Sequence, residues 1–84
     1  MKCAIDYNYY EKEITIYKVY SDGSMRAICR IYEDRNFLHL DVTGDNWKYL
    51  SELTRHYPIF NHDMAGISLN TLYNELVSVW KKGA

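Results

Sequence analysis

Apolar and polar side chains alternate along most of residues 13–42, and this period of two constrains the fold more than any other feature. Successive side chains of a β-strand point to opposite faces, so the alternation predicts strands with one buried and one solvent-facing side. Asp22-Gly23 and Asp34-Arg35 interrupt the pattern. Asp-Gly strongly favours a two-residue hairpin turn, because a type I′ turn needs a positive φ at both central positions. The segment therefore predicts three antiparallel strands in succession.

A third turn near Glu11-Lys12 adds a strand at the N-terminus. Two-residue turns at the three sites place Tyr7 opposite Ile16, Ile16 opposite Cys29, and Cys29 opposite Leu40. The three registers agree on a single inner face. A one-residue slip in any of them would turn the apolar side chains of one strand to the opposite face. This predicted inner face comprises Ile5, Tyr7, Tyr9, Ile14, Ile16, Lys18, Ala27, Cys29, Ile31, Leu38, Leu40 and Val42.

After residue 42 the apolar period changes from two to that of a helix. One amphipathic helix is predicted before Pro58, with Asp45 or Thr43 as its N-cap. Its apolar stripe consists of Trp47, Leu50, Leu53 and Tyr57. A second helix is predicted from Ser68, its N-cap, to Gly83, with a stripe of Leu69, Leu72, Leu76, Val79 and Trp80. The chain is therefore predicted to be one α+β domain, 1–84, in which a four-stranded antiparallel meander of order 1-2-3-4 is followed by two helices on one face.

Composition and charge narrow the class of protein. Ten basic and eleven acidic residues leave a formal charge of −1, which favours neither nucleic-acid binding by counterion release nor mimicry of DNA. The apolar fraction of 48% is that of a globular chain. No run is long enough to cross a membrane, and residues 1–10 lack the apolar stretch of a signal peptide. We therefore expect a cytoplasmic protein that does not associate with membranes.

The predicted outer face is unusually rich in aromatic and arginine side chains for a surface that should meet water. Such side chains are enriched at the centres of protein interfaces. The face is therefore a candidate partner-binding surface, whose residues are Tyr17, Arg26, Ile28, Arg30, Tyr32, Phe37 and His39. The alternative is that these side chains only reinforce a small sheet through cross-strand pairs.

The same face admits other partners. Two copies of the chain could meet through it as a structural homodimer. Single-stranded RNA is also read by aromatics on open sheets, although the chain has no ribonucleoprotein motif and Asp6, Glu13 and Asp41 dilute the positive charge. Nucleic acid is therefore the less favoured partner, and a protein the more favoured one.

Catalytic and metal-binding interpretations rest on few residues. His39 and Asp41 lie two apart on one predicted strand, with Arg30 opposite His39, but no nucleophile or oxyanion motif accompanies them. His56, His62 and Asp63 could approach one another near the end of the first helix, yet their spacing is not that of a zinc site. We therefore expect no enzymatic activity, no cofactor and no bound metal.

Cys3 and Cys29 both fall on the inner face, separated by a whole strand. Two interstrand spacings exceed the separation that a disulfide tolerates, so both thiols are expected to be reduced.

The remaining expectation is a small stand-alone protein that acts stoichiometrically, as an inhibitor or an adaptor, by docking on a protein partner. Phage-encoded inhibitors of bacterial defence systems (anti-CRISPR proteins among them), immunity proteins and antitoxins are of this general kind. This is an analogy of size and class and rests on no shared motif.

Overall fold

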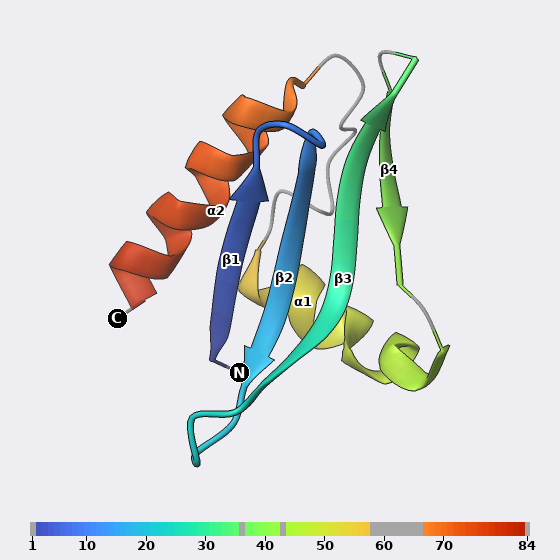
Figure 1. Cartoon of the computed structure of the whole chain (residues 1–84). Coiled ribbons are helices and arrows are strands. Elements are labelled where there is room, and N and C mark those ends of the chain that lie inside the picture. Colours follow the sequence, from blue (N-terminus) through green and yellow to red (C-terminus); the bar gives the residue numbers. More distant parts are fainter. Residues whose placement is uncertain (1, 36, 43, 58–66, 84) are drawn as a thin grey trace.

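The computed structural model describes residues 2–35, 37–42, 44–57 and 67–83. Four antiparallel strands form one sheet of order β1-β2-β3-β4, and helices follow it in the chain, as predicted. Figure 1 shows the helices on one side of the sheet, with α2 running beside β1 and α1 behind β2 and β3. The elements are β1 Cys3–Asn8, β2 Glu13–Val19, β3 Met25–Asp34, β4 Phe37–Asp41, the 3-10 helix η1 Gly44–Tyr49, α1 Leu50–His56 and α2 Leu69–Gly83.

The β1–β2 hairpin has a longer turn than predicted. Asn8 lies opposite Glu13, so four residues form the loop. The Asn8 side-chain oxygen accepts hydrogen bonds from the backbone N–H groups of Tyr10 and Glu11, at 3.0 and 3.1 Å, and Lys12 takes a positive φ of 53°. This side-chain turn moves the register by two residues, which keeps every side chain on its predicted face.

The β3–β4 hairpin shows the same kind of shift. Asp34 lies opposite Phe37, which places the turn one residue later than predicted, with Arg35 at a φ of 51°. Ile31 is therefore opposite Leu40 rather than Leu38. Because the slip is again by two residues, the inner and outer faces of β4 are as predicted.

The β2–β3 hairpin departs from the prediction in a way that does change faces. The Gly23 N–H donates to the Tyr20 carbonyl at 3.0 Å, and Gly23 has a φ of 89°, so residues 21–23 form a three-residue loop. The register next to this loop is consequently one residue off, with Lys18 opposite Arg26. A bulge at Ile28 then removes the offset.

Beyond the bulge, the predicted pairs of Ile16 with Cys29 and of Ile14 with Ile31 are confirmed. A bulge gives one strand an extra residue, so the alternation of faces reverses on one side of it. Met25 and Ala27, predicted to point inward, therefore share the outer face with Val19 and Tyr17, which lie opposite them.

The first predicted helix begins as a 3-10 helix, and this alters its buried stripe. A 3-10 helix has three residues per turn, so Asn46 and Tyr49 share one side of η1. Asn46 is buried and Tyr49 packs against the core, whereas Trp47 is 62% exposed. The prediction of Trp47 as a core residue was therefore wrong, because it assumed the α-helical period throughout.

Ser68 caps α2 as predicted, since its hydroxyl oxygen accepts a hydrogen bond from the Thr71 N–H at 3.1 Å.

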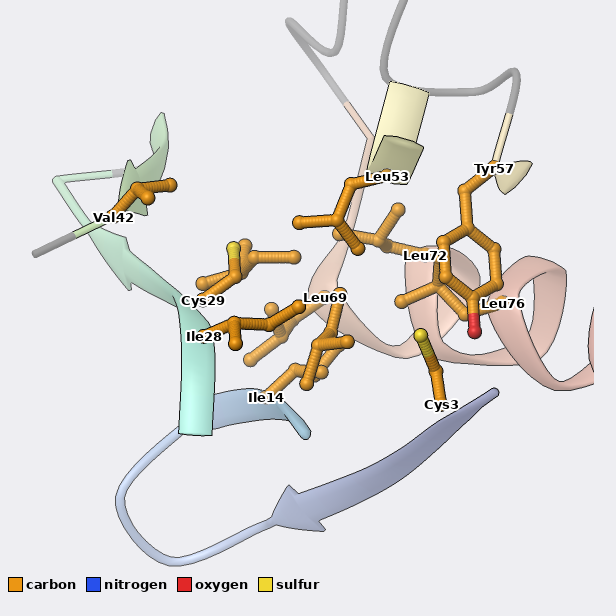
Figure 2. Close-up of a cluster of buried hydrophobic side chains, with 12 residues drawn as sticks. Cys3, Ile14, Ile28, Cys29, Val42, Leu53, Tyr57, Leu69, Leu72 and Leu76 are labelled. Carbon is orange, nitrogen blue, oxygen red and sulfur yellow. The ribbon is translucent and has the colours of Figure 1, made fainter. Parts of the chain in front are cut away.

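The core lies between the sheet and the helices. Figure 2 shows side chains of α1 and α2 meeting those of the strands. The buried apolar residues are Cys3, Ile14, Ile16, Ile28, Cys29, Ile31, Val42, Leu53, Tyr57, Leu69, Leu72 and Leu76. The opposite side of the sheet faces away from these helices.

Candidate functional site

The open face is the side of the sheet that faces away from the helices (Figure 1). Its described register sets two complete rows across the four strands, one of Asn8, Glu13, Tyr32 and His39 and one of Asp6, Thr15, Arg30 and Asp41. Tyr17 and Phe37 belong to the same face by strand alternation. The open face therefore combines two cross-strand rows of polar and aromatic side chains with apolar positions at its ends.

Arg30 is the best anchored charged side chain of the open face. Its Nε and Nη2 atoms both donate to the Glu13 carboxylate on β2, the second at 3.1 Å. These bonds lower the pKa of the Glu13 carboxyl and raise that of the Arg30 guanidinium. About half of the Arg30 side chain stays exposed, so the two-bond pairing orients the guanidinium while leaving part of it accessible.

Tyr32 and His39 form an aromatic pair beside this ion pair. Their ring centroids are 5.1 Å apart and the rings are inclined by only 14°, a stacked arrangement across β3 and β4. Both residues lie at adjacent cross-strand positions, where side chains approach most readily. Tyr32 is half-buried and His39 is exposed, so the pair presents a stacked aromatic surface to solvent.

Apolar side chains continue the open face towards two of its corners. Phe37, at the start of β4, is 63% exposed. Met25, which the bulge turns outward, is also an exposed large apolar side chain. Sequence reasoning missed Met25, because no pattern in residues 20–29 indicates a three-residue loop or the bulge that corrects the register after it. The open face is thus partly apolar at both ends of β3.

Five of the seven predicted partner-binding residues lie together on the open face, namely Tyr17, Arg30, Tyr32, Phe37 and His39. The other two do not. Ile28 is 1% exposed and belongs to the core, because the bulge turns it inward. Arg26 lies opposite Lys18 on the helix side, where its Nη2 donates to the Asp45 carboxylate of η1 at 2.6 Å. The prediction that Ile28 and Arg26 belong to the outer face was therefore wrong.

A polar cluster at the hairpin end of the sheet explains the one charged residue of the predicted inner face. The Lys18 ammonium lies 4.5 Å from the ring centroid of Tyr49 and 5.2 Å from that of Tyr20. A hydrogen bond with Tyr20, together with the charges of Lys18 and Lys48, lowers the pKa of the Tyr49 hydroxyl. Lys18 is thus accommodated by aromatic faces at the rim of the core.

The structure adds little support for the catalytic and metal-binding interpretations. His39 lies opposite Tyr32, and Arg30 lies opposite Asp41, so the predicted pairing of Arg30 with His39 was wrong by two residues. Among the described residues no three His, Cys, Asp or Glu side chains gather as metal ligands would. His62 and Asp63 of the other metal candidate lie outside the described residues.

The two cysteines are free and buried. Burial raises the pKa of both thiols, that of Cys29 to about 12. Figure 2 shows the Tyr57 hydroxyl directed towards Cys3. Low-pKa, accessible thiols are the reactive ones, so these two have the character of core residues.

Comparison with known proteins finds no matching family model and no significant similarity to a curated protein or to a solved structure. In the part of the chain that the structure describes, no helix is long and apolar enough to cross a membrane. The open face is therefore interpreted from its own residues.

Proposed function

We propose that this protein acts stoichiometrically, as an inhibitor or an adaptor, by docking the open face of its sheet on a protein partner. The observation that supports the proposal is that the oriented, half-exposed Arg30 lies on the same face as the stacked Tyr32–His39 pair, and that this face is turned away from the helices. Tyrosine and arginine contribute much of the binding free energy at protein interfaces. Tyrosine buries a large area with few rotatable bonds, and arginine forms several hydrogen bonds.

Preorganisation strengthens this interpretation. Glu13 holds Arg30 in place, and Tyr32 and His39 restrict one another, so little side-chain freedom remains to be lost on binding. Phe37 supplies exposed apolar area next to these polar groups. A centre of oriented polar and aromatic groups with apolar flanks is the usual composition of a protein-binding surface.

The charge of the open face favours a protein over a nucleic acid as the partner. The carboxylates of Asp6, Glu13 and Asp41 outnumber the cationic side chains of Lys2 and Arg30 on this face. A polyphosphate backbone would meet net repulsion there. By analogy of class, we extend the proposal to phage-encoded inhibitors of bacterial defence, immunity proteins and antitoxins, which act by binding a protein partner.

The test begins with affinity capture from a lysate of the source organism or its host, followed by reconstitution with the purified partner. Isothermal titration calorimetry should give a stoichiometry of one partner per open face. Tyr32→Ala and Arg30→Ala should each weaken binding by about 1–2 kcal/mol or more if they are central to the interface.

Matched controls are available for both substitutions. Tyr10→Ala removes an exposed tyrosine of the β1–β2 turn, and Arg55→Ala removes an exposed arginine of α1. Both control variants should bind as the unaltered protein does. Binding that is lost in the controls but kept in Tyr32→Ala and Arg30→Ala would reject the open face as the docking surface.

A further inference from the structure

We propose that β1 is the seam of a homodimer, in which the β1 strands of two copies pair antiparallel about a two-fold axis. The two four-stranded sheets would then form one continuous sheet of eight strands. This interface is the edge of the sheet, and its ion pairs would lie at the β1 border of the open face. The docking residues proposed above lie on β2, β3 and β4 and stay free, so the dimer is independent of that function.

The backbone of β1 is prepared for such pairing. β1 is the first strand in the sheet order, and among the described strands only β2 pairs with it. The Val19 N–H donates to the Lys2 carbonyl at 2.9 Å, so alternate residues from Lys2 onward direct their backbone groups to β2. In an antiparallel ladder the residues between them direct theirs away, here Cys3, Ile5 and Tyr7. The outer edge of β1 therefore presents a regular row of donors and acceptors.

The charges of β1 and of Lys2, the residue before it, favour a second copy of the chain as the occupant of this edge. Lys2 and Asp6 lie on the same side of the strand, four residues apart, with Ala4 midway between them. A two-fold axis at Ala4 sets Lys2 opposite the partner's Asp6, and Asp6 opposite the partner's Lys2. It also allows Cys3 to exchange two backbone hydrogen bonds with the partner's Ile5. By symmetry, Ile5 exchanges two with the partner's Cys3.

This register puts both ion pairs at non-hydrogen-bonded positions, where opposing side chains of an antiparallel pair come closest. The strand is thus complementary to its own copy in backbone pattern and in charge. β4, the other edge, offers no such match, because its residues Phe37–Asp41 include no lysine or arginine to face Asp41.

An apolar hollow lies beside the same edge. It has a volume of about 260 Å³ and is lined by Ala4 and Ile5 of β1 and by Tyr73 and Val77 of α2. The hollow thus joins β1, the first strand of the sheet, to α2. Two-fold pairing would bring the hollows of the two copies, and their α2 helices, together along the seam.

The test is the molar mass of the full chain in solution, measured by analytical ultracentrifugation over a concentration series. The unaltered protein should sediment as a dimer that dissociates on dilution. Lys2→Glu and Asp6→Lys each set like charges opposite one another and should raise the dissociation constant by about tenfold or more. The double variant with both substitutions restores opposite charges and should restore the dimer, which a misfolded variant could not do.

Lys12→Glu serves as the control, because it reverses a lysine of the β1–β2 turn, and it should leave the dimer unchanged. A monomer at every concentration would overturn the proposal. So would a dimer that the single substitutions leave intact, or one that the double variant fails to restore. Dissociation by Tyr32→Ala would also overturn it, by assigning the contact to the open face.

Discussion

Ile28 and Cys29 are neighbours on β3, and both side chains are buried in the core, at 1% and 2% exposed. Consecutive residues of a regular strand point to opposite faces, so in a sheet that helices cover on one side a bulge is needed to bury both in the same core. Figure 2 shows the two side chains within the same buried cluster. The bulge thus contributes an additional large apolar side chain to the core of a small domain, where each such residue is a sizeable fraction of the stability.

Replacing Ile28 with alanine should therefore lower the free energy of unfolding by about 2–4 kcal/mol, because it leaves a cavity among well-packed neighbours. Urea denaturation followed by circular dichroism measures the change. Ile28→Val removes a single methylene and should cost about 1 kcal/mol. A change within experimental error in both variants would place Ile28 on the surface, as a regular strand would have it.

Asn46 connects η1 to the same part of β3. Its Nδ2 donates to the carbonyl of Ala27 at 3.3 Å, next to the bulge, and the side chain is buried. Asn46→Ala should lower the free energy of unfolding by about 1–2 kcal/mol, because the Ala27 carbonyl loses its donor in a partly buried position. Trp47→Ala, on the exposed side of η1, is the matched control and should cost much less. Equal costs would show that this hydrogen bond is not what anchors η1.

The Glu13–Arg30 pair should give the stability a specific dependence on acid pH. Hydrogen bonds from Arg30 lower the pKa of the Glu13 carboxyl in the folded protein. Its stabilisation is therefore fully present above the unfolded pKa of about 4.3 and is lost as the pH falls through the folded pKa. Glu13→Gln should lower the free energy of unfolding at neutral pH by about 0.5 kcal/mol, since Arg30 is half exposed.

The difference between Glu13→Gln and the unaltered protein should shrink as the pH falls from the unfolded pKa of about 4.3 towards the lowered pKa of the folded protein, and it should vanish below that pKa, where the unaltered carboxyl is itself protonated. Urea denaturation at a series of pH values measures it. A difference that stays constant across the acid range would mean that the side chain stabilises the sheet by packing rather than by charge.

The thiols should be unreactive until the protein unfolds. Burial raises the pKa of Cys29 to about 12, three units above the ordinary value of 9.0. The thiolate fraction at mildly alkaline pH is then roughly a thousandfold smaller, and burial further blocks the reagent. Titration with a chromogenic disulfide reagent should detect no fast-reacting thiol in buffer and both cysteines in concentrated urea. A fast reaction of one thiol in buffer would mean that the edge or the core opens locally.

Much of the fold follows from local patterns of the chain. The period of two over residues 13–42, the turn near Glu11-Lys12 and the helical period after residue 42 predicted four strands followed by helices, the order of the strands and the side of the sheet that the helices cover. These features depend on which side chains avoid water, and the order of apolar and polar residues in the sequence gives that directly. For the same reason, five of the seven candidate binding residues were placed on the correct face from sequence.

The tertiary structure decided the register of each hairpin and the 3-10 geometry of η1. The Asn8 side chain bonds to its own turn, residues 21–23 form a three-residue loop, and η1 winds with three residues per turn. Turn residues favour a loop length without fixing it, because each register also changes which side chains are buried, and the packing of the whole domain decides between registers. Here that packing inserts Ile28 into the core and ties Asn46 to Ala27, two contacts between segments that only the folded chain brings together.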